Sequence, residues 1–324
     1  MDKEVVSVNK NQGQTRLMKR NTKRIIFYVL MLVIPLLQFC IFYIYANFNS
    51  VLLAFQKYEM KLDGLGYKVT FANFDNFIEA GRFFFSARSW EMITHSLKFY
   101  LCTLLIGTSL ALIFSYYVAK KYPGSTFFRI MLYLPTIISS VVLTLLFKYI
   151  VTDVYPIIIK NITGTRPTGL LDGSADMQYN AILVYSLWVS FGANVLLYTS
   201  SMSAIDPSIV ESAQLDGVTV IQEFLYIYFP MIFPTFTTFV VTGITGIFTN
   251  QMNLYTFFGE AGRNKFNIFG FFLYTETRAS GLIDNGKTMS YSELAALGLI
   301  ITLIIIPIVL TVRKLMEKFG PSED

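Results

Sequence analysis

Long apolar runs separated by polar connections dominate the chain. A helix needs about 20 mostly apolar residues to cross the hydrocarbon core of a bilayer, so each run predicts one membrane span. The runs cover residues 25–46, 97–119, 127–150, 181–202, 229–252 and 294–312. The pattern therefore predicts an all-α membrane protein with six transmembrane helices.

The composition agrees with this prediction. Of 324 residues, 54% are hydrophobic and 15% are charged, whereas a soluble domain carries about 25% charged residues. This balance excludes a disordered chain, an ordinary cytosolic enzyme and a nucleic-acid binder. Both cysteines, Cys40 and Cys102, lie in apolar runs, which gives no sign of a disulfide framework. Because His95 is the only histidine, we expect neither a multi-histidine metal site nor histidine-based catalysis.

The net charge of +5 is explained by the orientation of the chain in the membrane. Lys and Arg concentrate before the first span, at Lys120 and Lys121, and after the last span, and the cytoplasmic side of a membrane protein carries such an excess. We therefore expect residues 1–24 and 313–324 to be cytoplasmic tails around a transmembrane domain at 25–312. The connection 203–230 then faces the cytoplasm. Lys98 and Lys148 lie near outer span ends, where we expect them to snorkel toward the interface.

The aromatic segment 74–90 precedes the second span, and two interpretations remain open. It is either an interfacial helix on the outer leaflet or a helix packed on the surface of the bundle.

The connection 203–230 has the signals of two short helices. Asp206 and Pro207 are a typical cap and first helical residue, and Gly217 suits the left-handed position after a helix end. Thr219 and Gln222 have the spacing of a capping box that opens a second helix. All charged residues of this connection are acidic, namely Asp206, Glu211, Asp216 and Glu223. A connector lying on anionic lipid would carry basic residues, so the pattern favours docking to a protein with a basic-rimmed groove.

The same connection resembles a known motif. Glu211, Ser212, Ala213, Asp216, Gly217, Phe224, Ile227 and Pro230 are similar to the E-A-A-x-x-x-G loop of ABC importer permeases, with Ser212 and Val218 where alanine is usual. The sequence also resembles sugar permeases at further positions, namely Arg129, Leu134, Pro135, Ser139, Trp188, Gly192, Pro230 and Pro234. The sequence departs from their pattern at Gly259–Gly262, where many have Gly-Gly-Pro, and at His95-Ser96, where Asn-Thr is common.

This resemblance implies the fold of a type I ABC importer permease in a bacterial cell membrane. Two permeases would pair in the lipid over two ATPase subunits, the second permease being a different but related chain. An extracellular solute-binding protein would deliver a carbohydrate, expected to be an oligosaccharide. The implied contacts with the ATPase are Glu211, Ser212, Ala213, Asp216, Gly217 and Phe224. The chain itself would be non-catalytic and hold no cofactor, since Mg·ATP would bind only to the partner subunits.

Residues Gly281–Thr288 match the phosphate-binding pattern G-x-x-x-x-G-K-[ST]. A true phosphate-binding loop follows a buried strand and opens a helix of a sheet domain. Here the match lies between two spans on the expected outer face, which favours a simple external turn.

Polar side chains form two stripes in the membrane. Thr235, Thr238, Thr242, Thr245 and Thr249 recur at helical spacing and lead to Asn250, Gln251 and Asn253, and a second stripe comprises Ser186, Ser190, Asn194 and Tyr198. Hydroxyl and amide groups suit a carbohydrate pathway, for which the candidates are Asn194, Tyr198, Thr242, Thr245, Thr249, Asn250, Gln251 and Asn253. Hydrogen bonding within and between helices explains such stripes equally well.

Other functions fit less well. A secondary transporter or channel would place an ionisable residue in mid-membrane, and an intramembrane enzyme would need paired acids or a Ser–His set. Neither arrangement is visible in the six runs. An ABC permease for a non-sugar solute remains the main alternative.

Overall fold

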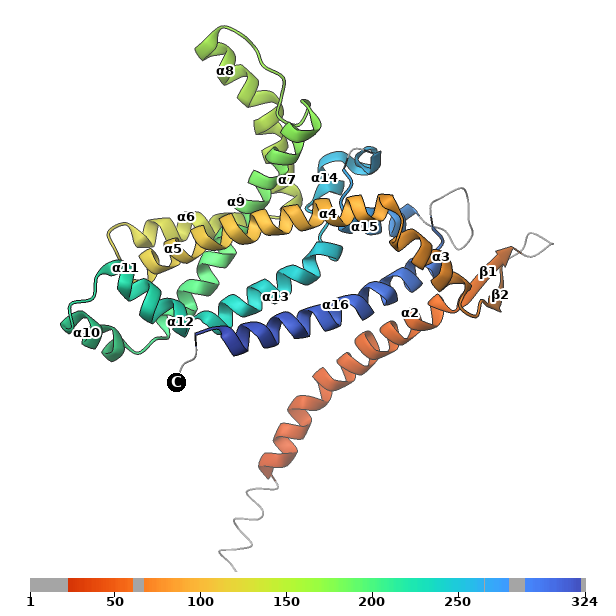
Figure 1. The fold of residues 1–324 in the computed structure, drawn as a ribbon, viewed down its shortest axis with the longest axis horizontal. Coiled ribbons are helices and arrows are strands. Elements are labelled where there is room, and N and C mark those ends of the chain that lie inside the picture. Colours follow the sequence, from red (N-terminus) through yellow and green to blue (C-terminus); the bar gives the residue numbers. More distant parts are fainter. Residues whose placement is uncertain (1–22, 61–66, 265, 280–288, 322–324) are drawn as a thin grey trace, which may run out of the picture. The chain divides into compact units, whose positions relative to one another are not determined.

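The computed structural model describes residues 23–60, 67–264, 266–279 and 289–321 (Figure 1). Contacts divide the chain into two units, Met1–Phe74 and Asp75–Asp324, and each is described by itself. Most of the expected N-terminal tail and the Gly281–Thr288 match lie outside the described residues.

The first unit is a long helix followed by a hairpin. The helical run Lys23–Ala54 includes a π-helical stretch, η1 (Phe39–Tyr45), and ends in α2 (Ala46–Ala54). It extends past the expected boundary at residue 46. The antiparallel strands β1 (Gln56–Met60) and β2 (Tyr67–Phe71) follow, with Gln56 paired to Phe71. This two-stranded sheet departs from the all-α expectation, although the fold remains predominantly helical.

The second unit is helical in its described parts. Its first half comprises α3 (Asp75–Phe84), α4 (Ala87–Cys102), η2 (Thr103–Thr108), α5 (Ser109–Ala119), α6 (Ser125–Ile137), α7 (Ser140–Tyr149), η3 (Ile150–Val154), α8 (Tyr155–Thr163) and α9 (Ala175–Ser203). Its second half comprises α10 (Pro207–Leu215), α11 (Val220–Glu223), η4 (Phe224–Tyr228), α12 (Phe229–Met231), α13 (Phe233–Thr249), α14 (Leu254–Phe258), η5 (Gly259–Asn264), α15 (Phe269–Ala279) and α16 (Tyr291–Phe319).

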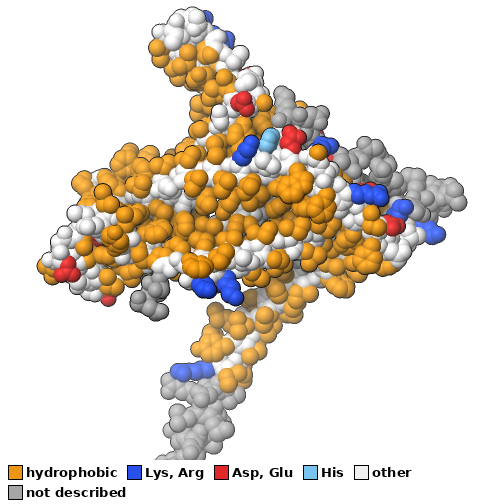
Figure 2. All heavy atoms as spheres, in the orientation of Figure 1, with side chains coloured by type: hydrophobic (Ala, Val, Ile, Leu, Met, Phe, Trp, Pro, Cys, Tyr) orange, Lys and Arg blue, Asp and Glu red, His pale blue; other side chains and the backbone are white. Residues whose placement is uncertain are grey.

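Helices of membrane-spanning length and composition confirm most of the expected spans. Five continuous runs qualify within the described residues, and a bent pair makes a sixth. Besides Lys23–Ala54 they are Ala87–Ala119, Ser140–Thr163, Ala175–Ser203 and Tyr291–Phe319. The last run is helical through residues 313–319, which were expected to belong to the C-terminal tail. On the face that Figure 2 shows, hydrophobic side chains cover the middle of this unit, and many charged side chains lie toward its edges.

The third span was predicted wrongly in its bounds. Instead of one helix over 127–150, α6 ends at Ile137, Ile138 is extended, and α7 begins at Ser140. Pro135, which lies in the last turn of α6, has no N–H to donate and crowds the preceding turn. The helix therefore stops nearby, and the continuous run of spanning length is Ser140–Thr163.

The fifth span is bent. Segments Val220–Met231 and Phe233–Gly262 meet at an angle of 67° around Ile232. Pro230 and Pro234 flank this residue, and both lack the N–H that would continue the helical ladder.

Helix α9 packs against both α5 and α6. The buried Ser115 Oγ of α5 donates to the backbone oxygen of Val195 at 3.0 Å. On the other side, a Cβ added to Gly192 would lie 1.7 Å from the carbonyl oxygen of Leu132 in α6. Only a residue without a side chain permits this approach of two backbones.

The aromatic segment 74–90 does not form one helix. Helix α3 packs against α16 through a face that buries Asn76, Ala80 and Phe84, and α4 begins at Ala87. This packing favours the second interpretation, a helix on the surface of the bundle. Helix α15 was not expected within the long fifth connection.

We expect Gly192→Ala to destabilise the protein by about 3 kcal/mol or more, because α6 and α9 must separate to admit the new Cβ. Thermal unfolding of the purified protein in detergent measures the change. Gly298→Ala is the matched control, since no atom lies within 4 Å of its added Cβ. Equal melting temperatures for both variants would contradict the close crossing.

Candidate functional site

The connection between α9 and α13 has the expected two-helix structure. Asp206 caps α10, with its carboxylate accepting a hydrogen bond of 2.9 Å from the Ser208 N–H, and this backbone bond holds the pKa of Asp206 below its usual value. Thr219 and Gln222 form the predicted capping box at the start of α11. Gly217, with φ of +81°, occupies the left-handed turn between the helices, as predicted.

Two of the acids in this connection are fully available to a partner. Glu211 and Ser212 are exposed on α10, and Asp216 is exposed at its C-cap, whereas Ala213 is half-buried. The exposed side of α10 is therefore acidic, and its inner side carries Val210, which is buried in the core.

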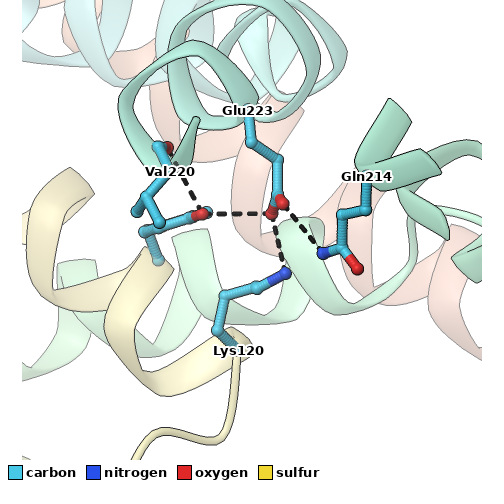
Figure 3. Close-up of polar contacts among 5 residues, drawn as sticks. Lys120, Gln214, Val220 and Glu223 are labelled. Carbon is cyan, nitrogen blue, oxygen red and sulfur yellow. Dashed lines mark hydrogen bonds and ion pairs between the residues drawn. The ribbon is translucent and has the colours of Figure 1, made fainter. Parts of the chain in front are cut away.

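The fourth acid of the connection, Glu223, differs from these exposed acids. Its side chain is buried, and its Oε1 lies 2.8 Å from Lys120 Nζ and accepts a hydrogen bond of 3.0 Å from the Tyr116 hydroxyl (Figure 3). Its Oε2 accepts a bond of 2.9 Å from Gln214 Nε2. The sequence showed only the sign of this charge, since the partners on α5 are more than a hundred residues away.

Phe224 also helps to attach the connection to the bundle, through contacts inside the molecule. Its ring meets the edge of the Tyr116 ring with centroids 5.4 Å apart, and Tyr228 lies 5.0 Å from the same ring. Three aromatic side chains thus attach the second helix of the connection to the end of α5.

A cavity of about 360 Å³ lies among α4, η2, α9 and α13. Its polar lining includes Ser96, Thr103, Thr108, Ser186, Ser190, Asn194, Thr242 and Asn250, and its apolar lining includes Phe99, Tyr100, Phe239 and Met252. Part of each predicted polar stripe therefore faces one space, namely Ser186, Ser190 and Asn194 of α9 and, from the other stripe, Thr242 and Asn250. Its mixture of hydroxyl, amide and aromatic groups is able to hydrogen-bond and stack against a polar solute.

Three predicted pathway residues, Asn194, Thr242 and Asn250, line this cavity. Within the described chain, no hydrogen bond uses the Asn194 amide. Asn250 Oδ1 accepts one of 2.8 Å from the Met252 N–H.

The remaining pathway candidates lie outside the cavity lining. Tyr198 is buried, with its ring centroid 4.7 Å from that of Phe239. The hydroxyls of Thr245 and Thr249 donate to carbonyls of their own helix, those of Thr242 and Thr245. These contacts match the alternative interpretation, hydrogen bonding within a helix.

Gln251 and Asn253 occupy the irregular segment after α13. Gln251 Oε1 is buried without a hydrogen-bond partner among the described residues. Met252 and Asn253 have φ of +55° and +56°, and Asn253 starts α14. Two consecutive left-handed residues without glycine are uncommon and cost free energy, and this turn brings Met252 to the cavity wall.

Lys148, which we expected near an outer span end, has a partner within the protein. Its Nζ donates to the carbonyl oxygen of Phe257 at 2.9 Å, which ties α7 to α14. No group of three or more His, Cys, Asp or Glu in the described ranges is arranged to hold a metal ion.

A family model described as "Binding-protein-dependent transport system inner membrane component" matches residues 103–322. The match covers more than half of the chain, so the chain belongs to this family of membrane transport permeases.

Individual relatives are more distant. The maltodextrin transport permease MdxF of Bacillus subtilis is 30% identical over 44% of this chain and 33% of its own length. The arabinooligosaccharide permease AraP of Halalkalibacterium halodurans is 28% identical over 47% of this chain and 48% of its own. The chain thus covers half or less of the length of these curated relatives.

A solved structure of a bacterial ABC transporter for import of alginate has the same fold. Its similar chain aligns with a TM-score of 0.70 over 94% of this chain and 99% of its own, at 20% identity. The predicted class of fold, that of an ABC importer permease, is confirmed.

At Gly217 the turn requires a left-handed backbone but has open space around it. We expect Gly217→Val to lower the free energy of unfolding by about 1–2 kcal/mol, because a β-branched residue is strained at this φ. Asn tolerates this conformation, so Gly217→Asn should lower the free energy of unfolding by less than Gly217→Val does. Melting curves of the two purified variants make the comparison, and an equal loss would show that strain at φ is not the cause.

Proposed function

We propose that the chain is the permease subunit of an ATP-driven importer and forms part of the pathway for a carbohydrate, expected to be an oligosaccharide. The structure of the connection 203–230 is the main support for coupling between this chain and the ATPase subunits. Its two helices are capped and anchored to α5, and α10 presents exposed acids. A rigid, acidic projection suits the transfer of force from a partner with a basic groove.

In this proposal two ATPase subunits bind Mg·ATP, and this chain contributes no catalytic residue and no cofactor site. Glu211 meets a basic side chain of the ATPase, and Ser212, Ala213 and Asp216 complete the docking face of α10. Gly217 sets the angle between α10 and α11. Phe224 holds the second helix against α5. A second, related permease subunit and an extracellular solute-binding protein complete the importer in the membrane lipid.

The positive-inside rule supports an orientation with both termini in the cytoplasm of a bacterial cell. The connection 203–230 and its acids then face the compartment that holds ATP. This orientation also places the Asn250–Asn253 turn toward the outer side, where a binding protein would release its solute.

A carbohydrate substrate is supported by two observations. The cavity offers hydroxyl and amide groups beside aromatic rings, and the two similar curated permeases are named for maltodextrin and arabinooligosaccharides. An ABC permease for a non-sugar solute is the alternative. It is tested with the complete complex in nanodiscs, by asking which of a panel of sugars, amino acids and peptides raises the ATPase rate in the presence of the binding protein.

For the coupling contact, we expect Glu211→Arg and Gly217→Pro to uncouple ATP hydrolysis from uptake while leaving membrane insertion intact. Glu211→Arg reverses a docking charge, and Gly217→Pro changes the angle between the helices, because proline cannot adopt positive φ. Uptake and ATP hydrolysis are measured together in proteoliposomes. Glu317→Gln, which removes an exposed acid of α16, is the control. Normal transport by both coupling variants would contradict the assignment.

For the pathway, we expect Asn194→Leu to reduce uptake about tenfold or more, because a buried polar solute would lose a hydrogen-bonding partner. Ser200→Ala is a matched control on the same helix, since the Ser200 hydroxyl donates to its own helix at Leu196. Initial rates of uptake of the sugar selected by the panel provide the measurement. Equal rates for the two variants would remove Asn194 from the pathway.

A further inference from the structure

The buried carboxylate of Glu223 joins three segments. Its own helix is α11, its Oε2 binds Gln214 at the end of α10, and its Oε1 binds Tyr116 and Lys120 at the end of α5 (Figure 3). A single side chain thus fixes both helices of the connection to the bundle.

The burial makes this contact unlike an ordinary surface ion pair. The side chains of Lys120 and Glu223 are 17% and 5% exposed, whereas those of Arg313 and Glu317 are 62% and 57% exposed. Removing water from a charge is costly unless its partners replace the lost hydrogen bonds. Here three donors satisfy the carboxylate, so the low-energy arrangement requires α5, α10 and α11 to keep their relative positions.

The contacts continue from α5 toward the cavity. Ser115, which adjoins Tyr116, donates its hydroxyl hydrogen bond to the Val195 carbonyl of α9. The residue that precedes Val195 in α9 is Asn194, which lines the cavity. Hydrogen bonds and packed backbone therefore link α10 continuously to the cavity wall, and a displacement of α10 can be transmitted along them.

We propose that Glu223 is a positioning residue for energy coupling, which makes α10 and the end of α5 move as one body. This role rests on the proposed function, in which α10 receives the motion of the ATPases. Glu223 acts from inside the molecule and contacts neither the ATPase nor the solute.

The first test asks whether the two helices move together. Nitroxide labels are placed on exposed Ser208 of α10 and exposed Ile113 of α5, in the complete complex with Cys40 and Cys102 replaced by alanine. We expect one narrow distance distribution, unchanged by Mg·ATP. In Lys120→Met, which leaves the carboxylate without its cation, the distribution should broaden. Equally narrow distributions in both proteins would overturn the proposal.

The second test measures coupling. We expect Lys120→Met and Glu223→Gln to raise the ATP hydrolysed per sugar imported by about tenfold. The exchange Lys120→Glu with Glu223→Lys should recover most of the loss, because Gln214 and Tyr116 are able to accept hydrogen bonds as well as donate them. Glu317→Gln in the exposed pair should leave the ratio unchanged. Fully assembled single variants with an unaltered ratio would contradict the role.

The two proposals fail in different ways. Without ATP-driven uptake by the unsubstituted complex, the importer assignment fails, while the label distances still report whether Glu223 joins α10 to α5. If Lys120→Met does not assemble, Glu223→Gln provides both measurements, because the amide keeps an acceptor and leaves no buried negative charge.

Discussion

A backbone in hydrocarbon must satisfy its own N–H and C=O groups, and this constraint accounts for the architecture. Long helices satisfy it wherever they are unbroken. Where α13 ends, the Asn250 side chain satisfies one of the freed backbone groups, because its Oδ1 accepts a hydrogen bond from the Met252 N–H. The same interruption brings Asn250 and Met252 to the wall of the cavity. The break in the helix and the polar space are therefore two consequences of one local structure.

The same cost of losing water applies to charge at the other end of the unit. Glu223 is tolerated in its buried position because Lys120, Tyr116 and Gln214 surround its two oxygens. An apolar residue at this position would pack against its neighbours without requiring any particular hydrogen-bond donor. The carboxylate instead requires particular donors on α5 and α10, which fixes the connection to the bundle and leaves Glu211 exposed.

Sequence reasoning was most successful where the determinants are local. The N-cap at Asp206, the left-handed turn at Gly217 and the capping box at Thr219 depend on neighbouring residues, and all were predicted. It was less successful with the third span, because hydropathy does not register the break that follows Pro135. It also did not separate Glu223 from the other acids of the connection, since sign and position along the chain do not indicate burial.

The long apolar runs by themselves predicted that the chain crosses a membrane as helices. Helical spacing predicted the polar stripes on α9 and α13, because spacing alone decides which residues of a helix share a face. Packing decided which members of those stripes meet. Asn194, Thr242 and Asn250 line one cavity, while Tyr198 packs on Phe239 and Thr245 bonds its own helix. The difference arises because the direction of a side chain follows from its own helix, whereas what it meets depends on segments distant in sequence.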